Sequence, residues 1–144
     1  MQMKISTGVK QGYLKVKEGF TQELFLSLNP PFPPVKLLRF DGCNKGDIVS
    51  LELNFILFKQ VWESLITEGE TTSQEFRFID EGVKLPFFLK HWKHHHRVIT
   101  DGGHSKIIDD IEFKTPFFLL DWLMWPILYL QFLYRIPIYK RIFQ

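Results

Sequence analysis

Apolar and polar residues alternate along two runs of the sequence, on either side of the Asp-Gly dipeptide at 101–102. Asp-Gly between two alternating runs is among the strongest short-range signals for a β-hairpin with a two-residue turn. A turn at 101–102 pairs Thr100 with Gly103, and this register places His94 opposite Asp109. The sequence therefore predicts an antiparallel hairpin in which an imidazole and a carboxylate meet across two strands.

One face of this hairpin is mainly apolar, yet it also carries side chains that form hydrogen bonds. Successive residues of a strand point to opposite sides of a sheet, so every second residue shares a face. The predicted face consists of Trp92, His94, His96, Val98, Ser105, Ile107, Asp109, Ile111 and Phe113. Two imidazoles and a carboxylate on an apolar face are expected where a sheet lines a pocket rather than a dry core.

The rest of the chain predicts further strands between two helical segments. Residues 5–17 alternate like a strand, and Thr21 has the position of a helix N-cap before a short helix that ends at Asn29, ahead of the prolines. Further strands are expected at 35–40, 48–58, 60–68 and 75–80, with Trp62, Phe76, Phe78 and Asp80 among their inward candidates. Short turns between consecutive strands and helices near the chain ends predict an antiparallel sheet of the α+β class.

The C-terminal segment 117–139 approaches the length of a membrane span. It contains Asp121 and Arg135, and a central charge costs about 2.5–3.5 kcal/mol on insertion scales. A buried helix is therefore favoured over a span or surface docking, with the stripe Trp122, Trp125, Tyr129 and Phe132 facing the sheet. Pro126 is expected to kink this helix or mark its beginning, and Pro137 to end it. Peripheral membrane contact by the tail 138–143 remains an alternative.

Composition limits the function classes. A chain of 144 residues is expected to form one domain, 1–144, and 16% aromatic residues suit a large apolar interior, part of it left open for a ligand. The net charge of +2 is too small to indicate nucleic-acid binding. Cys43 is the only cysteine, which favours a reducing compartment, and its turn position predicts an exposed thiol. Residues 1–8 hold no apolar run, so no signal peptide is expected and the predicted location is the cytoplasm.

The motif Trp92-x-His94-x-His96, followed by Ser105-x-Ile107-x-Asp109, resembles the START-like superfamily, also called SRPBCC. Its members include the birch-pollen allergen, polyketide cyclases and dehydratases, lipid-transfer domains and ubiquinone-binding chaperones. The chain is most similar to a bacterial ligand-binding group with a Trp-x-His-x-His strand, a Thr-x-x-x-Asp strand and a C-terminal helix that contains arginine, matched here by Arg135. Ser105 stands where threonine is usual.

The resemblance implies a helix-grip fold, in which a curved antiparallel sheet of six to seven strands wraps around a long C-terminal helix and a short helix follows the first strand. A deep cavity between sheet and helix would hold sterols, lipids, polyketides, quinones or plant hormones. The superfamily has no shared set of catalytic residues, so the resemblance implies none for this chain.

From these observations we expect the protein to bind or carry a hydrophobic or amphipathic small molecule, such as a lipid, quinone or polyketide, without a cofactor or metal. The expected ligand contacts are Trp62, Phe76, Phe78, Trp92, His94, His96, Ile107, Asp109, Ile111, Phe113, Trp125 and Tyr129. Three alternatives stay open. His94 and Asp109 would act as acid and base in a cyclase or dehydratase, His94, His96 and Asp109 would hold a metal ion, or the chain's own phenylalanines would fill the cavity.

Overall fold

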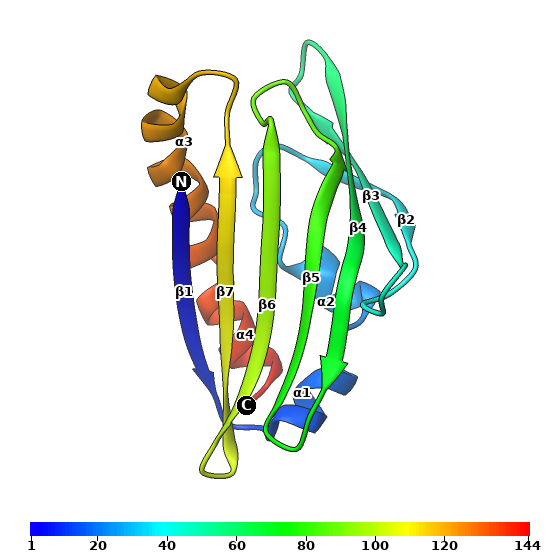
Figure 1. The fold of residues 1–144 in the computed structure, drawn as a ribbon, viewed down its shortest axis with the longest axis vertical. Helices are drawn as coiled ribbons and strands as arrows, with labels where there is room; N and C mark the ends of the chain where they lie inside the picture. Colours follow the sequence, from blue (N-terminus) through cyan, green and yellow to red (C-terminus); the bar gives the residue numbers. More distant parts are fainter.

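The computed structural model describes residues 1–144 as seven strands and four helices (Figure 1). The strands are β1 (Gln2–Val9), β2 (Val35–Phe40), β3 (Ile48–Asn54), β4 (Lys59–Thr71), β5 (Glu75–Lys84), β6 (His91–Asp101) and β7 (His104–Lys114). The helices are α1 (Tyr13–Glu18), α2 (Gln22–Ser27), α3 (Phe118–Leu133) and α4 (Arg135–Ile142).

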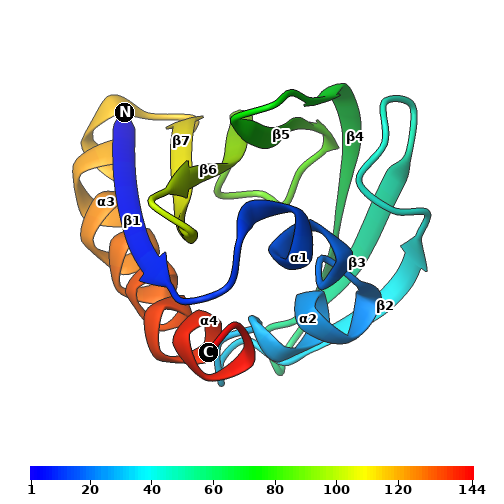
Figure 2. The same cartoon turned by 90° about the horizontal axis from the view of Figure 1, so that it is seen from below.

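All seven strands belong to one antiparallel sheet, in the order β1-β7-β6-β5-β4-β3-β2. Strands β2 to β7 form a meander, and β1 pairs with β7 at one edge of the sheet. The sheet curves strongly, with α3 and α4 beside β1 and with α2 near β2 and β3 (Figure 2). Helix α1 packs against β5, β6 and β7. The predicted α+β class with a curved antiparallel sheet is therefore confirmed.

The β6–β7 hairpin turns one residue later than predicted. Thr100 pairs with Ser105, and the turn residues are Gly102 and Gly103, with φ values of 56° and 90°. A type I′ turn needs positive φ at both central residues, and glycine adopts these angles without a steric penalty from Cβ. The Gly-Gly pair therefore occupies the turn in preference to Asp101-Gly102.

The cross-strand partners change with this turn, but the faces do not. His94 lies opposite Ile111, and His96 lies opposite Asp109, so the predicted direct pairing of His94 with Asp109 was wrong. Each partner moved by two residues, and side chains two residues apart share a face. The two imidazoles and the carboxylate consequently remain on the concave side of the sheet.

The N-terminal segment differs from the predicted long first strand. β1 ends at Val9, and residues 13–18 form α1, which buries Val16 completely. The predicted N-cap of the next helix is confirmed, because the hydroxyl of Thr21 accepts a hydrogen bond from the amide of Leu24 at 3.3 Å. Strand β3 ends at Asn54 rather than at residue 58, since Ile56 adopts a positive φ of 74°.

The C-terminal segment forms two helices that meet at Tyr134. Pro126 lies inside α3 and does not begin it, and Pro137 lies in the first turn of α4 and does not end the helix. Amide groups in a first turn have no partner within the helix, so the missing N–H of Pro137 costs no hydrogen bond there. None of the four helices has both the length and the apolar character that crossing a membrane requires.

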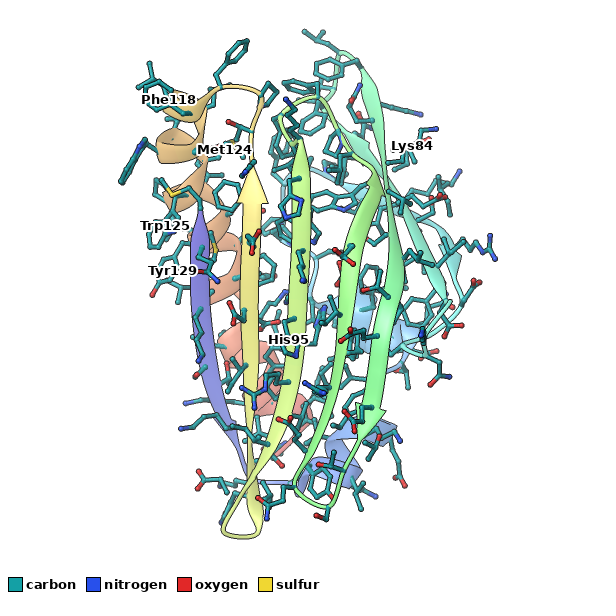
Figure 3. The ribbon with its side chains drawn as sticks, viewed as in Figure 1. Lys84, His95, Phe118, Met124, Trp125 and Tyr129 are labelled. Carbon is teal, nitrogen blue, oxygen red and sulfur yellow. The ribbon has the colours of Figure 1, made fainter.

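Of the aromatic stripe predicted on α3, only Phe132 is buried against the sheet. Leu128 and Phe132 are buried, whereas Trp122 is 69% exposed. Trp125 and Tyr129 stack at 4.8 Å, and the indole of Trp125 donates to the carbonyl of Gln2 in β1 (Figure 3). Trp125 and Tyr129 therefore fasten α3 to the edge strand and lie outside the concave interior.

Candidate functional site

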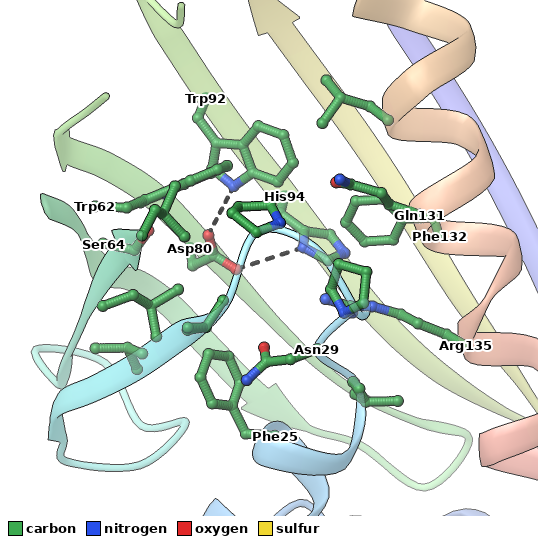
Figure 4. A pocket seen from close by; sticks show the side chains of 18 of the residues that line it. Phe25, Asn29, Trp62, Ser64, Asp80, Trp92, His94, Gln131, Phe132 and Arg135 are labelled. Carbon is green, nitrogen blue, oxygen red and sulfur yellow. Dashed lines mark hydrogen bonds and ion pairs between the residues drawn. The ribbon is translucent and has the colours of Figure 1, made fainter. Parts of the chain in front are cut away.

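A cavity of about 590 Å³ lies between the concave face of the sheet and the helices. Residues of β2 to β6, of all helices except α1, and of the connecting loops line it, and 25 of the 37 lining residues are hydrophobic (Figure 4). Small-molecule sites span about 300–1,000 Å³ and are mostly apolar with a few polar groups that orient the ligand. The cavity therefore has the size and lining of such a site.

Two imidazoles and two carboxylates form a polar network at the centre of the concave face. Asp80 pairs with His94 across β5 and β6, and His96 pairs with Asp109 across β6 and β7. Arg135, the first residue of α4, reaches this group from the opposite side (Figure 4). Strand alternation and two neighbouring pairings thus place four titratable side chains on one surface.

Each imidazole bonds one carboxylate and turns toward the other. Nε2 of His94 lies 2.8 Å from Oδ1 of Asp109, and Nε2 of His96 lies 2.6 Å from Oδ2 of Asp80. The Nδ1 atoms face the remaining carboxylates at longer distances, 3.6 Å from His94 to Asp80 and 3.8 Å from His96 to Asp109. An ionised carboxylate only accepts, so Nε2 carries the hydrogen in both rings.

Stacking holds the two rings in this arrangement. The ring centres of His94 and His96 are 3.5 Å apart, and Phe78 stacks on His96 at 4.1 Å. On the other side of the network, the indole nitrogen of Trp92 donates to Oδ1 of Asp80 at 3.1 Å (Figure 4). Every ring of the network is therefore fixed by an aromatic neighbour and a hydrogen bond.

Burial and neighbouring charge set the protonation states. Burial lowers the pKa of His94 to about 4, assisted by the nearby His96, so His94 is neutral at pH 7. Burial alone would raise the pKa of Asp109, but the hydrogen bond from His94 and the charge of Arg135 outweigh it and lower the pKa to about 2. Asp80 behaves in the same way. Burial alone would raise its pKa, but the hydrogen bond from His96 acts against burial, and the pKa is lowered.

A metal ion fits this network poorly. One ligand atom each from Asp80, His94 and His96 lies within 4.8 Å of the others, so the third ligand would be Asp80 and not the predicted Asp109. A ligating imidazole directs a lone pair in its own plane at the ion. The planes of His94 and His96 are stacked and differ by only 29°, so their lone pairs do not converge. Hydrogen bonding explains the arrangement better than coordination.

No family model matches the sequence, and no curated protein does. Solved structures do match. Ginseng major latex-like protein 151 from Panax ginseng has a TM-score of 0.64 at 17% identity, over 95% of this chain and 92% of that one. The Zhui aromatase/cyclase from Streptomyces sp. R1128 has a TM-score of 0.59 at 16% identity, over 81% and 69%. A protein from Chromobacterium violaceum has a TM-score of 0.65 at 14% identity, over 92% and 90%.

The chain has the helix-grip fold that these solved structures share. The expected family resemblance is thereby confirmed at the level of the fold. In this helix-grip protein the gripped element is α3 together with α4, and the cavity lies where the resemblance placed it, between sheet and helix.

The helix-grip cavity contains five of the twelve predicted contact residues. Trp62, Phe78, Trp92, His94 and His96 line it. The other sheet residues, Phe76, Ile107, Asp109, Ile111 and Phe113, are buried outside the cavity lining, and Trp125 and Tyr129 lie against β1. Asp109 does not line the cavity itself, but it contacts three residues that do, His94, His96 and Arg135.

Several cavity residues were not among the predicted contacts. Asn29 and Ser64 point into the cavity, and Gln131 enters it from α3 (Figure 4). Gln131 is the one amide side chain in an otherwise apolar helical stretch, and this contrast could have marked it as a cavity residue. Asn29 follows α2, and nothing in the sequence around it indicates a place in the cavity. Cys43 also lines the cavity. Its thiol is half-buried rather than exposed, and burial raises its pKa to about 12, which removes the thiolate needed for nucleophilic chemistry.

Proposed function

We propose that this protein binds a hydrophobic or amphipathic small molecule, such as a lipid, quinone or polyketide, in the cavity between the sheet and α3. The observation that carries this proposal is the apolar cavity of about 590 Å³ with a hydrogen-bonded network on one wall. The chain's own phenylalanines leave this space open, which argues against a self-filled interior. The ligand's apolar body would contact the phenylalanine and leucine side chains.

Polar groups that lack partners indicate where the ligand's polar end would lie. The side chains of Asn29, Ser64 and Gln131 line the cavity and make no hydrogen bond within the protein. Asp80 and His96, which bond each other at 2.6 Å, lie on the same wall as Ser64. A ligand hydroxyl, carbonyl or amide in this region would supply the hydrogen-bond partners that these side chains lack and would fix the ligand's orientation.

Narrowing the cavity is expected to weaken binding. Leu51 is half-buried and lines the cavity, so Leu51→Trp places an indole where the ligand's apolar body would lie. We expect the affinity for the fluorescent probe 1-anilinonaphthalene-8-sulfonate to fall by at least about tenfold, because the indole occupies apolar space that the probe would fill. Fluorescence titration measures this, and native mass spectrometry of the purified wild type should show a co-purifying lipid-like molecule.

Lys36→Trp is the matched control, because Lys36 is exposed on β2, adjacent to the strand that carries Leu51. The control should bind the probe like the wild type. Equal probe affinity in both variants, together with no co-purified molecule, would disprove the binding proposal.

The second candidate function is acid–base catalysis, because a histidine–carboxylate pair faces the cavity and a structural neighbour is an aromatase/cyclase. His94 suits this role poorly, since its side chain is 3% exposed and its low pKa makes it a weak base. His96 is the better candidate, with a side chain 13% exposed and Nε2 held by Asp80. Its Nδ1 would take the proton.

One assay separates catalysis from binding. If the protein is a dehydratase, the wild type should convert a 3-hydroxyacyl thioester to the enoyl thioester and water, and His96→Gln should reduce the rate by about 100-fold or more. The binding proposal predicts no enoyl absorbance above the background with either protein. A wild-type rate that His96→Gln leaves unchanged would exclude His96 as the base.

A further inference from the structure

One end of the molecule carries bulky apolar side chains that no other part of the chain covers. They come from the β3–β4 turn, the β5–β6 loop and the start of α3, which all lie at the upper end of the molecule in Figure 1. Phe118, at the start of α3, is labelled in Figure 3. We call this surface the apolar end and define it by Ile56, Leu57, Phe87, Phe117, Phe118 and Trp122. Leu57 is 91% exposed and Phe118 is 73% exposed.

Exposure of this kind is unusual for a monomeric protein. Single exposed apolar residues are normal, but a contiguous apolar patch of several hundred Å² marks a contact surface. Here the exposed residues lie on three connections that are far apart in sequence, and two of these connections, the β3–β4 turn and the β5–β6 loop, touch. The ring centres of Phe58 and Phe87 are 5.5 Å apart, and those of Phe55 and Phe87 are 6.0 Å apart. The apolar end is therefore formed by residues from separate parts of the chain that the fold places at one end of the molecule.

Lysines stand directly behind the apolar end. Lys59 begins β4, Lys84 ends β5, Lys90 precedes β6 and Lys114 ends β7, and all four are exposed (Lys84 is labelled in Figure 3). Lys59 has an ion-pair contact of 3.7 Å with Glu52, while the other three form none. Three acidic residues lie near them: Glu63 is opposite Lys84, Glu112 faces His91 at 3.2 Å, and Asp121 accepts from the amide of Thr115. Exposed lysine ammonium groups therefore accompany the apolar tips.

The cavity opens at the same end. Phe87 and Phe117 line the cavity, yet they are 60% and 69% exposed, so they stand at its rim. A molecule that passes this rim would move between the cavity and whatever covers the apolar end without crossing water.

We propose that the apolar end docks into the surface of an anionic lipid bilayer, with the turn residues among the acyl chains and the lysines at the level of the headgroups. Apolar tips backed by lysines match a bilayer surface, whose interior is apolar and whose headgroups carry negative charge. A second copy of the chain fits less well, because a two-fold contact through this end would bring its lysines against those of the partner.

Vesicle binding tests this proposal. We expect the full chain to co-sediment with vesicles of phosphatidylcholine containing about 30% phosphatidylserine at least tenfold more tightly than with phosphatidylcholine alone, because each lysine near the surface adds to the attraction. The double variant Leu57→Asp, Phe118→Asp should bind anionic vesicles at least about tenfold more weakly. The double variant Lys84→Glu, Lys90→Glu should lose most of the preference for phosphatidylserine while keeping the apolar residues.

Leu14→Asp is the matched control, because Leu14 is 52% exposed on α1, at the other end of the molecule (Figure 1). It should bind like the wild type. Equal binding of Leu57→Asp, Phe118→Asp and the wild type, or no binding to either vesicle, would overturn the proposal. Self-association in sedimentation velocity that this double variant abolishes, without vesicle binding, would identify a second copy as the occupant. Probe binding measured without vesicles reports on the cavity separately.

Discussion

Phe132→Ala is expected to lower the free energy of unfolding by about 3–5 kcal/mol, the usual cost of truncating a buried phenylalanine. Phe132 is 6% exposed and joins α3 to the polar network. Its ring meets His94 edge-on at 5.2 Å and stacks near Trp92 at 6.1 Å, and the guanidinium of Arg135 lies 4.3 Å above its centre. Truncation leaves a void and removes a cation–π contact. Urea denaturation followed by circular dichroism measures the loss.

Leu130→Ala provides the control for this prediction. Leu130 lies two residues away on α3 but is 64% exposed, so its truncation should change the free energy of unfolding by no more than about 0.5 kcal/mol. Similar losses in the two variants would mean that α3 does not pack against the sheet through Phe132.

The faces of the β6–β7 hairpin were predictable from sequence, whereas its register was not. Alternation with a period of two assigns Trp92, His94 and Asp109 to one face whichever pair of residues turns, provided that partners move by an even number. The turn itself was ambiguous because Asp101, Gly102 and Gly103 offer two overlapping dipeptides. The His94–Asp109 contact survives the change of register because a histidine reaches the diagonal neighbour as well as the direct one.

The role of α3 was predicted only in part for a different physical reason. The helix is apolar nearly all round, so periodicity does not single out one face. Aromatic spacing predicted a stripe of Trp122, Trp125, Tyr129 and Phe132, but only Phe132 of this set is buried, together with Leu128. The same property leaves Trp122 exposed at the apolar end. A helix without a polar face has to be placed by its neighbours, which the sequence pattern does not contain.

Asp80 shows the limit of local patterns for a site. Alternation placed it on the face of Phe76 and Phe78, but its bond to His96 depends on the pairing of β5 with β6, across the loop 85–90. Nothing in either strand alone specifies that register. The sequence therefore identified some of the side chains that line the cavity, while their pairwise contacts came from the assembled sheet.

Stability is expected to fall as the pH drops from about 6.5 to about 4, because His94 resists protonation in the folded state. Its pKa is lowered from 6.5 to about 4 by burial and by the nearby His96. Within this window the unfolded chain binds a proton at residue 94 that the folded protein does not bind, so acid favours unfolding. The stabilisation is fully present above pH 6.5 and is lost toward pH 4, with a total on the order of 3 kcal/mol.

Below this window Asp109 continues the trend. Its pKa is lowered from 3.8 to about 2, so the stability that its ionised form contributes is present above pH 3.8 and disappears toward pH 2. The two groups therefore act in succession, and the free energy of unfolding should decline in two stages. Urea denaturation at a series of pH values and constant ionic strength would measure both stages.

His94→Gln isolates the first stage. Glutamine can still donate to Asp109 but does not titrate, so the variant should be less stable than the wild type at pH 7 and show a flatter curve between pH 6.5 and 4. His104→Gln is the matched control, because His104 is exposed beside the hairpin turn and its loss should leave the slope intact. His95, whose pKa burial also lowers, would account for a part of the slope that remains in His94→Gln. A slope as steep as that of the wild type would mean that the neutral state assigned to His94 is incorrect.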